Sequence, residues 1–190
     1  MPNRSPWLGE IPSTKDILAD ALKEVEIDLE NPSLTARKLE EKCHEIYRRY
    51  EAKVREKWKD KVPIDKLELS LSQSRVSRAG HTVELILQKL LDLMGIEYER
   101  NKKINEERLD FVIPNVETLK KDPKNAPDNI WFVSLYEPPE YAVKTMTKLN
   151  IRVYVPDEFY EKFKEHGARR FSEMFEDLRR FRRTRTLTDF

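Results

Sequence analysis

Residues 72–91 read SQSRVSRAGHTVELILQKLL, and residues 109–114 read LDFVIP. After its polar start the first stretch is apolar on almost every face, which predicts a helix from Ser77 to Met94 in the middle of a domain. Gly95 then fits a C-terminal cap. The second stretch is a short β-rich run that Pro114 ends. A buried helix followed by a strand indicates a domain that combines helices with a sheet.

Helices are predicted before this stretch and a sheet after it. Upstream, apolar spacing predicts a helix over residues 14–25, capped by Ser13 or Thr14, and a long helix from Ser33 to Trp58. Residues 59–72 resemble a linker with a turn around Pro63. Downstream, two strands are expected with a helix between them, an order that fits a right-handed parallel crossover; the three segments are IWFVSLY (130–136), EYAVKTMTKLN (140–150) and IRVYVP (151–156).

These elements predict an α/β (α+β) chain in which helices flank a mixed sheet. Residues 1–66 form an N-terminal helical region, and residues 67–190 form the second domain. DEFYEKFKEH is expected to be a short helix that starts at an Asp cap. Residues 169–183 are expected to form a basic amphipathic helix.

Composition excludes several classes of protein and site. Lys and Arg number 36 and Asp and Glu 35, for a net charge of +1, so any nucleic-acid surface must come from local clustering. Cys43 is the only cysteine, and His44, His81 and His166 are scattered, which argues against a disulfide framework or a structural zinc site. No apolar run is long enough to span a bilayer, and the N-terminus has no apolar signal core. We expect a cytoplasmic protein.

The polar start of the apolar helix carries a candidate binding site. Arg75 and Arg78 are three residues apart, and Ser74 and Ser77 are placed to cap the helix beside them. Hydroxyl groups, amide donors and two guanidinium groups at a helix start suit a phosphate group or the edge of a base.

Two acids stand out because their sequence neighbours are apolar. Glu84 lies among Val83, Leu85 and Ile86, and Asp110 lies in the LDFVIP strand. A carboxylate in such surroundings needs a partner. Magnesium, which activates water for phosphodiester hydrolysis, favours one or two carboxylates together with waters and phosphate oxygens. From the residues alone, a buried salt bridge or a cap is the simpler explanation of these acids.

At these residues the sequence resembles a known family. SQSRVSRAGHTVELILQKLL followed by LDFVIPN resembles the type II restriction endonucleases of the PD-(D/E)xK superfamily, in the group of PspGI and the C-terminal domain of EcoRII. The strand–helix–strand segment that ends in IRVYVP also resembles the closing part of those enzymes. The resemblance covers roughly residues 70–165 and implies a restriction-endonuclease-like fold for residues 67–190.

The resemblance also implies roles for residues and partners. Glu84 and Asp110 would bind Mg²⁺, and Arg75 and Arg78, with Ser74 and Ser77 beside them, would contact DNA. The implied activity is magnesium-dependent, sequence-specific hydrolysis of double-stranded DNA by a homodimer. A DNA methyltransferase that protects the host is the implied genetic partner.

One element of the family pattern is not visible in this sequence. In the family, the strand that carries the Asp is followed by a second strand. That second strand ends in the pattern acid or Ser, any residue, Lys. Here VETLKKDPKNAPDN is rich in turn residues, and it holds Lys120, Lys121 and Lys124 after Glu117. Either Lys120 or Lys121 substitutes for the family lysine, or the chain is a catalytically impaired, DNA-binding relic that has lost an internal segment.

Two further alternatives remain open from the sequence. A helical interaction module without nucleic acid, built on the helix from Ser33 to Trp58, is a different class of function. The C-terminal segment from Ala168 to Phe190 contains seven Arg and no Lys, a composition that suits either a DNA contact or a dimer contact.

Overall fold

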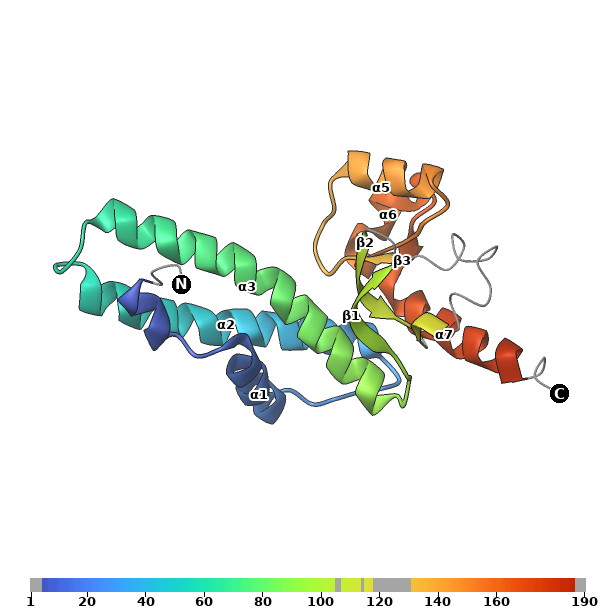
Figure 1. Cartoon of the computed structure of the whole chain (residues 1–190), viewed down its shortest axis with the longest axis horizontal. Helices are drawn as coiled ribbons and strands as arrows, with labels where there is room; N and C mark the ends of the chain where they lie inside the picture. The colour runs from blue at the N-terminus through green and yellow to red at the C-terminus, as the bar shows by residue number, and fades with distance from the viewer. Residues whose placement is uncertain (1–4, 105–106, 114, 118–130, 187–190) are drawn as a thin grey trace. The chain divides into compact units, whose positions relative to one another are not determined.

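The computed structural model describes residues 5–104, 107–113, 115–117 and 131–186, with the side chains of residues 103–109 and 181–186 outside that description (Figure 1). The chain forms two compact units. The first comprises residues 1–29 and 34–94, and the second comprises residues 30–33 and 95–190. The domain boundary expected between residues 66 and 67 falls inside a helix, and the two units meet in sequence at Met94 and Gly95.

The first unit is helical. Its elements are a short 3-10 helix η1 (Pro6–Glu10), α1 (Thr14–Glu24), α2 (Pro32–Trp58) and α3 (Ile64–Leu93). The helices predicted over residues 14–25 and 33–58 are confirmed. Ser13 is the cap of α1, because its hydroxyl accepts from the amide of Asp16 and the Asp16 carboxylate accepts from the amide of Ser13.

The start of the apolar helix was predicted wrongly. α3 begins at Ile64, directly after Pro63, and runs without a break through Ser77 to Leu93. Its early turns are anchored by Leu67 and Leu71, which are fully buried and lie four residues apart on one helix face. The alternating letters of LELSL concealed that spacing. Ser74 and Ser77 are therefore not caps of α3, because the N-terminus of α3 lies ten or more residues before them.

A β-hairpin opens the second unit. Gly95 follows α3 with a φ of 63°, as expected of a glycine at a helix C-terminus. Strands β1 (Glu99–Ile104) and β2 (Glu107–Val112) then pair antiparallel, with Arg100 opposite Phe111 and Lys102 opposite Leu109. The ring of Phe111 packs edge-on against Tyr98 and lies under the guanidinium of Arg100.

A second, parallel sheet follows. Strands β3 (Trp131–Val133) and β4 (Arg152–Val155) pair parallel and are connected through helix α5 (Glu140–Lys148), which confirms the expected strand–helix–strand unit. A two-residue strand that the sequence did not predict, β5 (Arg169–Arg170), pairs with the other edge of β4 and gives the order β3-β4-β5.

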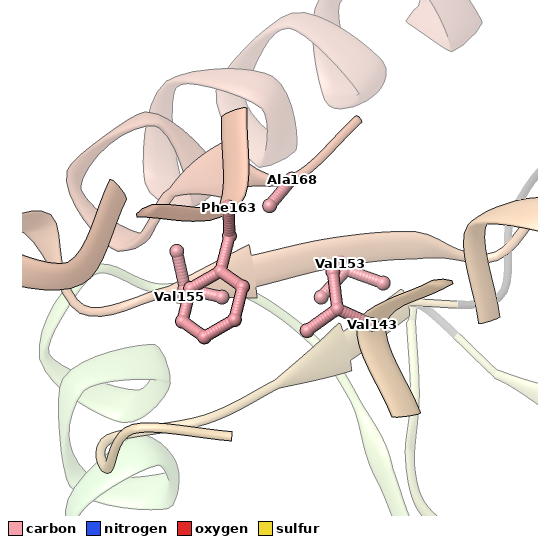
Figure 2. Packing of buried hydrophobic residues seen from close by; sticks show 5 residues of the cluster. All are labelled: Val143, Val153, Val155, Phe163 and Ala168. Carbon is pink, nitrogen blue, oxygen red and sulfur yellow. The ribbon is translucent and has the colours of Figure 1, made fainter. Parts of the chain in front are cut away.

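The two faces of β4 are buried by different helices. Val153 and Val155 pack with Val143 of α5, Phe163 and Ala168, all buried, in the cluster that Figure 2 shows. The alternate residue Tyr154 is fully buried, and its hydroxyl donates to Asp177 of α7 (Phe171–Thr186) at 2.8 Å. Alternation along one strand thus places α5 and the following helical segment on one face, and α7 on the other.

The helix expected over DEFYEKFKEH is broken into three short pieces. These are η3 (Asp157–Phe159), α6 (Tyr160–Phe163) and η4 (Lys164–His166). Pro156, not Asp157, occupies the cap position of the first piece. The Asp157 carboxylate instead accepts from the amide of Ser172, in the first turn of α7, at 3.0 Å. Among the described residues, no helix is long and apolar enough to cross a membrane.

Candidate active site

Asp110 is an exposed carboxylate on strand β2. Its neighbours along the strand are in regular antiparallel pairing, Phe111 with Arg100 and Leu109 with Lys102. This register places Asn101 opposite Asp110. Asn101 has a φ of 52°, in the left-handed region that asparagine tolerates better than most residues. The hairpin therefore departs from regular strand geometry at the position facing Asp110, as strands often do beside functional groups.

The Asp110 carboxylate makes no side-chain hydrogen bond or ion pair with the described side chains, which do not include those of residues 103–109. The sequence left a salt bridge or a helix cap open as the role of Asp110. Neither is found for its carboxylate in the described part of the chain. A carboxylate oxygen is the kind of ligand that a hard divalent cation such as Mg²⁺ binds, together with several waters.

Glu84 lies on α3, in the first unit, and its side chain is 30% exposed. One carboxylate oxygen lies 3.7 Å from Nδ1 of His81, one helical turn earlier. The neighbouring residues Leu85 and Ile86 are buried, as the apolar pattern predicted. Glu84 and Asp110 belong to different units, so their joint use as metal ligands stays a prediction. No group of three or more His, Cys, Asp or Glu side chains that could hold a metal occurs within the described ranges.

Arg75 is held by an acid of the neighbouring helix. Its guanidinium Nη2 lies 2.6 Å from Oε1 of Glu51 on α2, and the Glu51 side chain is only 5% exposed. A second pair, Arg55 with Glu68, joins the same two helices. The Arg55 guanidinium holds the pKa of the Glu68 carboxyl below its ordinary value. Arg75 is still 44% exposed, so part of its guanidinium faces solvent.

Arg78 holds the N-terminal arm. Its Nη1 donates to the carbonyl of Pro12 at 2.6 Å, its Nη2 donates to the carbonyl of Ile11 at 3.4 Å, and its Nε donates to the hydroxyl of Ser74. The guanidinium also lies over the ring of Tyr47, 5.5 Å from the centroid. Ser77 is exposed, one position away in sequence. Arg78 therefore has a structural role in the first unit whatever else it contacts.

The sequence contains a signal for the Arg75 contact at Glu51. Glu51 follows Tyr47 by four residues and precedes Val54 by three, so it lies on the apolar stripe of α2. An acid at a core position requires a cation from another element. Once residues 64–76 are known to be helical, the arginines of the SQSRVSR stretch are candidates for the cation that pairs with Glu51.

The lysines suggested as catalytic elements, Lys120 and Lys121, lie outside the described residues, as does Lys124. Within the described strands β1 to β5, no acid is followed two residues later by a lysine. The family element missing from the sequence is thus not supplied by any strand in the described part of the chain.

Comparison with known proteins identifies the family. The family described as EcoRII C terminal matches residues 38–134, more than half of the chain. The PspGI restriction endonuclease in complex with substrate DNA is similar over 93% of this chain and 95% of that chain, with 30% sequence identity and a TM-score of 0.77.

Two structures of Ecl18kI are similar in fold. Both are metal-depleted, one in complex with uncleaved DNA and one with uncleaved, modified DNA. Each has 17% identity over 96% of this chain and 82% of that chain, with TM-scores of 0.71 and 0.70. A search of curated protein sequences gave no match. The family match and the near-complete overlap with PspGI show that this chain belongs to the EcoRII C-terminal family and has the fold of a type II restriction endonuclease.

Proposed function

We propose that the protein binds double-stranded DNA at a specific sequence and hydrolyses its phosphodiester bonds with Mg²⁺. The observation that carries the proposal is the 30% identity to PspGI, an endonuclease whose structure contains its substrate DNA, over nearly the whole of both chains. The exposed Asp110, which lies opposite the irregular position Asn101 in the hairpin, is the acid to which we assign the metal.

Asp110 and Glu84 are the proposed metal ligands. Mg²⁺ bound by such carboxylates lowers the pKa of a coordinated water and offsets charge on phosphate oxygens. Asp110 offers an exposed carboxylate, and Glu84 a partly exposed one on the helix that carries the family motif. Lys120 or Lys121 would orient the attacking water and offset the developing charge.

Arg75, Arg78, Ser74 and Ser77 are the proposed DNA contacts, and the two arginines differ in the contacts that they make within the protein. Arg75 pairs with Glu51 and keeps 44% of its side chain exposed, which leaves donors for a guanine edge or a phosphate. Arg78 already donates to two carbonyls and a hydroxyl. We therefore expect Arg75 to contribute more to DNA binding than Arg78.

A second candidate is a DNA-binding relic of the same fold that does not cut. The absence of an acid-x-Lys element from the described strands favours it, because the lysine contributes directly to the hydrolytic step in this superfamily. Such a protein would keep Arg75 and bind the recognition sequence, yet leave it intact. Both candidates imply a homodimer that binds a near-palindromic site. An active enzyme also implies a DNA methyltransferase as its genetic partner.

Plasmid DNA incubated with the purified protein separates the candidates. Discrete fragments that form with Mg²⁺ and not with EDTA support the nuclease. Retarded but intact DNA under both conditions supports the relic, and no effect on DNA rejects both. If fragments form, the variants Lys120→Gln and Lys121→Gln are tested for cutting and for DNA binding. The substitution that abolishes cutting but retains DNA binding identifies the catalytic lysine.

A further inference from the structure

The core of the first unit contains an acid whose position is not explained by packing alone. Glu51 lies on the inner face of α2, between the buried residues Tyr47 and Val54, and its side chain is 5% exposed. Among the described residues, it is the only buried one that carries a charge. Taking a carboxylate out of water is costly, and an apolar residue of similar volume often gives equal or greater stability at such a position. The acid therefore has a purpose other than holding the two helices together.

The partner of Glu51 indicates what this purpose is. Its Oε1 accepts from Nη2 of Arg75 on α3 at 2.6 Å, while the Arg75 side chain remains 44% exposed. The ion pair thus extends from the core to the surface, with the carboxylate at the inner end and the guanidinium at the outer end. If Arg75 turned away, the buried carboxylate would lose its charged partner, which is strongly unfavourable. Glu51 therefore restricts the orientation of a surface guanidinium.

A second ion pair between the same helices has no buried end. Arg55 donates to Glu68 at 2.5 and 3.0 Å, and the two side chains are 38% and 44% exposed. The hydrogen bond from Arg55 is the main cause of the lowered pKa of the Glu68 carboxyl, and the charge of Arg75 adds to it. The two pairs are therefore neighbours, and of the two only Arg75–Glu51 fixes a surface guanidinium from the core.

We propose that Glu51 is a positioning residue for DNA binding, which acts through Arg75 and does not itself touch DNA. This inference rests on the proposed function, in which Arg75 contacts DNA. A guanidinium carries donors on more than one edge, so Nη2 can stay with Glu51 while the exposed donors meet a phosphate or a guanine. Because Arg75 is already ordered before DNA binds, less side-chain entropy is lost on binding and affinity is higher.

The negative charge of Glu51 alone would have the opposite effect on DNA binding. Replacing an acid by a neutral residue adds one unit of net positive charge, which by itself strengthens association with a polyanion. The positioning role predicts weaker binding when Glu51 is replaced. The direction of the change in affinity therefore distinguishes the positioning role from a simple effect of charge.

The test compares Glu51→Met with the matched control Glu68→Met. Methionine is close to glutamate in volume, adapts to core positions and favours a helix. Each variant removes one acid that joins α2 to α3, but Arg55, the partner of Glu68, is not a proposed DNA contact. The apparent dissociation constant is measured by gel mobility shift in EDTA, with end-labelled fragments of a digested plasmid, which offer many sequences at once. Urea denaturation followed by circular dichroism measures the stability of each variant.

We expect Glu51→Met to weaken DNA binding by about two- to tenfold, the effect of one long side chain that must be ordered on binding, while its stability stays close to that of the wild type. Glu68→Met should bind at least as tightly as the wild type. Glu51→Gln retains an oxygen that can accept from Arg75, so its affinity should lie between those of the wild type and Glu51→Met. In protein that also carries Arg75→Gln, Glu51→Met should have no further effect, because the two residues act as one unit.

Wild-type or tighter binding by Glu51→Met would overturn the inference and leave the proposed function intact, as would unchanged binding by Arg75→Gln. The inference also fails if Glu51→Met weakens binding equally in the Arg75→Gln background, or if Glu68→Met weakens it as much, since either result assigns the effect to the fold of the two helices. If Glu51→Met does not fold, Glu51→Gln in both Arg75 backgrounds decides in the same way. A wild-type protein that does not bind DNA rejects the proposed function together with the inference.

Discussion

At the scale of single residues, Arg78 shows how one side chain joins distant parts of the first unit. It bridges the N-terminal arm and α3 through the carbonyls of Pro12 and Ile11, and it covers the ring of Tyr47 on α2. The arm is also held by Trp7, whose Nε1 donates to the Ser70 hydroxyl at 2.7 Å. The family motif therefore serves the architecture of the unit as well as any contact with DNA.

Arg78→Ala should lower the free energy of unfolding by about 1–3 kcal/mol, because two carbonyl acceptors lose a charged donor. Urea denaturation followed by circular dichroism measures the change. The matched control is Arg48→Ala, an exposed arginine of α2, for which about 0.5 kcal/mol or less is expected. Equal effects of the two substitutions would show that the arm does not depend on Arg78.

Cys43 should be chemically inert in the native protein. It is 3% exposed, and burial, with a smaller effect of Glu40, raises the pKa of its thiol to about 12. The reactive thiolate is therefore scarce at pH 8, and Ellman's reagent should react rapidly only after urea is added.

The raised pKa of the Cys43 thiol also makes the free energy of unfolding depend on pH under alkaline conditions. The folded state binds the Cys43 proton more tightly than the unfolded state, so this contribution is complete below the ordinary thiol pKa and is lost as pH rises from there towards about 12. Rapid labelling of the native protein at pH 8 would contradict the burial of Cys43.

At the scale of elements, helix α3 carries both the family motif and the central packing of the first unit. Its early turns bury Leu67 and Leu71, and its late turns bury Leu85, Ile86, Leu90 and Leu91. The ion pairs Arg75–Glu51 and Arg55–Glu68 join it to α2. A continuous helix fixes the spacing between these ion pairs and Glu84, which places the proposed DNA contacts and a proposed metal ligand on one rigid element.

Ser77→Pro tests this continuity. In the middle of a helix, proline removes a hydrogen bond and clashes with the preceding turn, so the substitution should cost about 3 kcal/mol or more. Ile64→Pro is the matched control, because Ile64 is exposed and occupies the first helical position, where proline is tolerated. Thermal unfolding compares the two. A Ser77→Pro variant as stable as Ile64→Pro would place the helix start at Ser77 and contradict a helix that begins at Ile64.

Much of the element order could be predicted from sequence because it depends on local signals. The Ser13 cap, the apolar stripe of α2, Gly95 after α3 and the β-α-β segment each follow from a few neighbouring residues. The start of α3 could not be predicted, because Leu67 and Leu71 also fit an alternating pattern and tertiary burial decides between the two. Strand β5 has only two residues, and its pairing with Tyr154 and Val155 is non-local.

The candidate site was predictable only in part, for a similar reason. Asp110 and Glu84 stand out as acids among apolar letters, but their surroundings depend on the fold. Asp110 is exposed, although its strand neighbours suggested burial. The partner of Arg75 is Glu51, which lies 24 residues earlier, on another helix. Contacts of this kind arise from the packing of helices and not from sequence neighbours.

At the scale of the whole molecule, the chain belongs to the EcoRII C-terminal family and has the fold of a type II restriction endonuclease. Its match to PspGI covers both chains almost fully, while the acid-x-Lys element is absent from the described strands. The proposed function therefore depends on Asp110 and Glu84 as metal ligands and on a lysine outside those strands.

The single-turnover rate of DNA cutting with Mg²⁺, measured for the wild type, Asp110→Asn and Glu165→Gln, tests the proposed function most directly. Glu165 is an exposed acid of the second unit and serves as the control. The proposal predicts discrete fragments from the wild type and from Glu165→Gln, and no cutting by Asp110→Asn with its DNA affinity retained. Cutting by Asp110→Asn at the wild-type rate, or no cutting by the wild type, would contradict it.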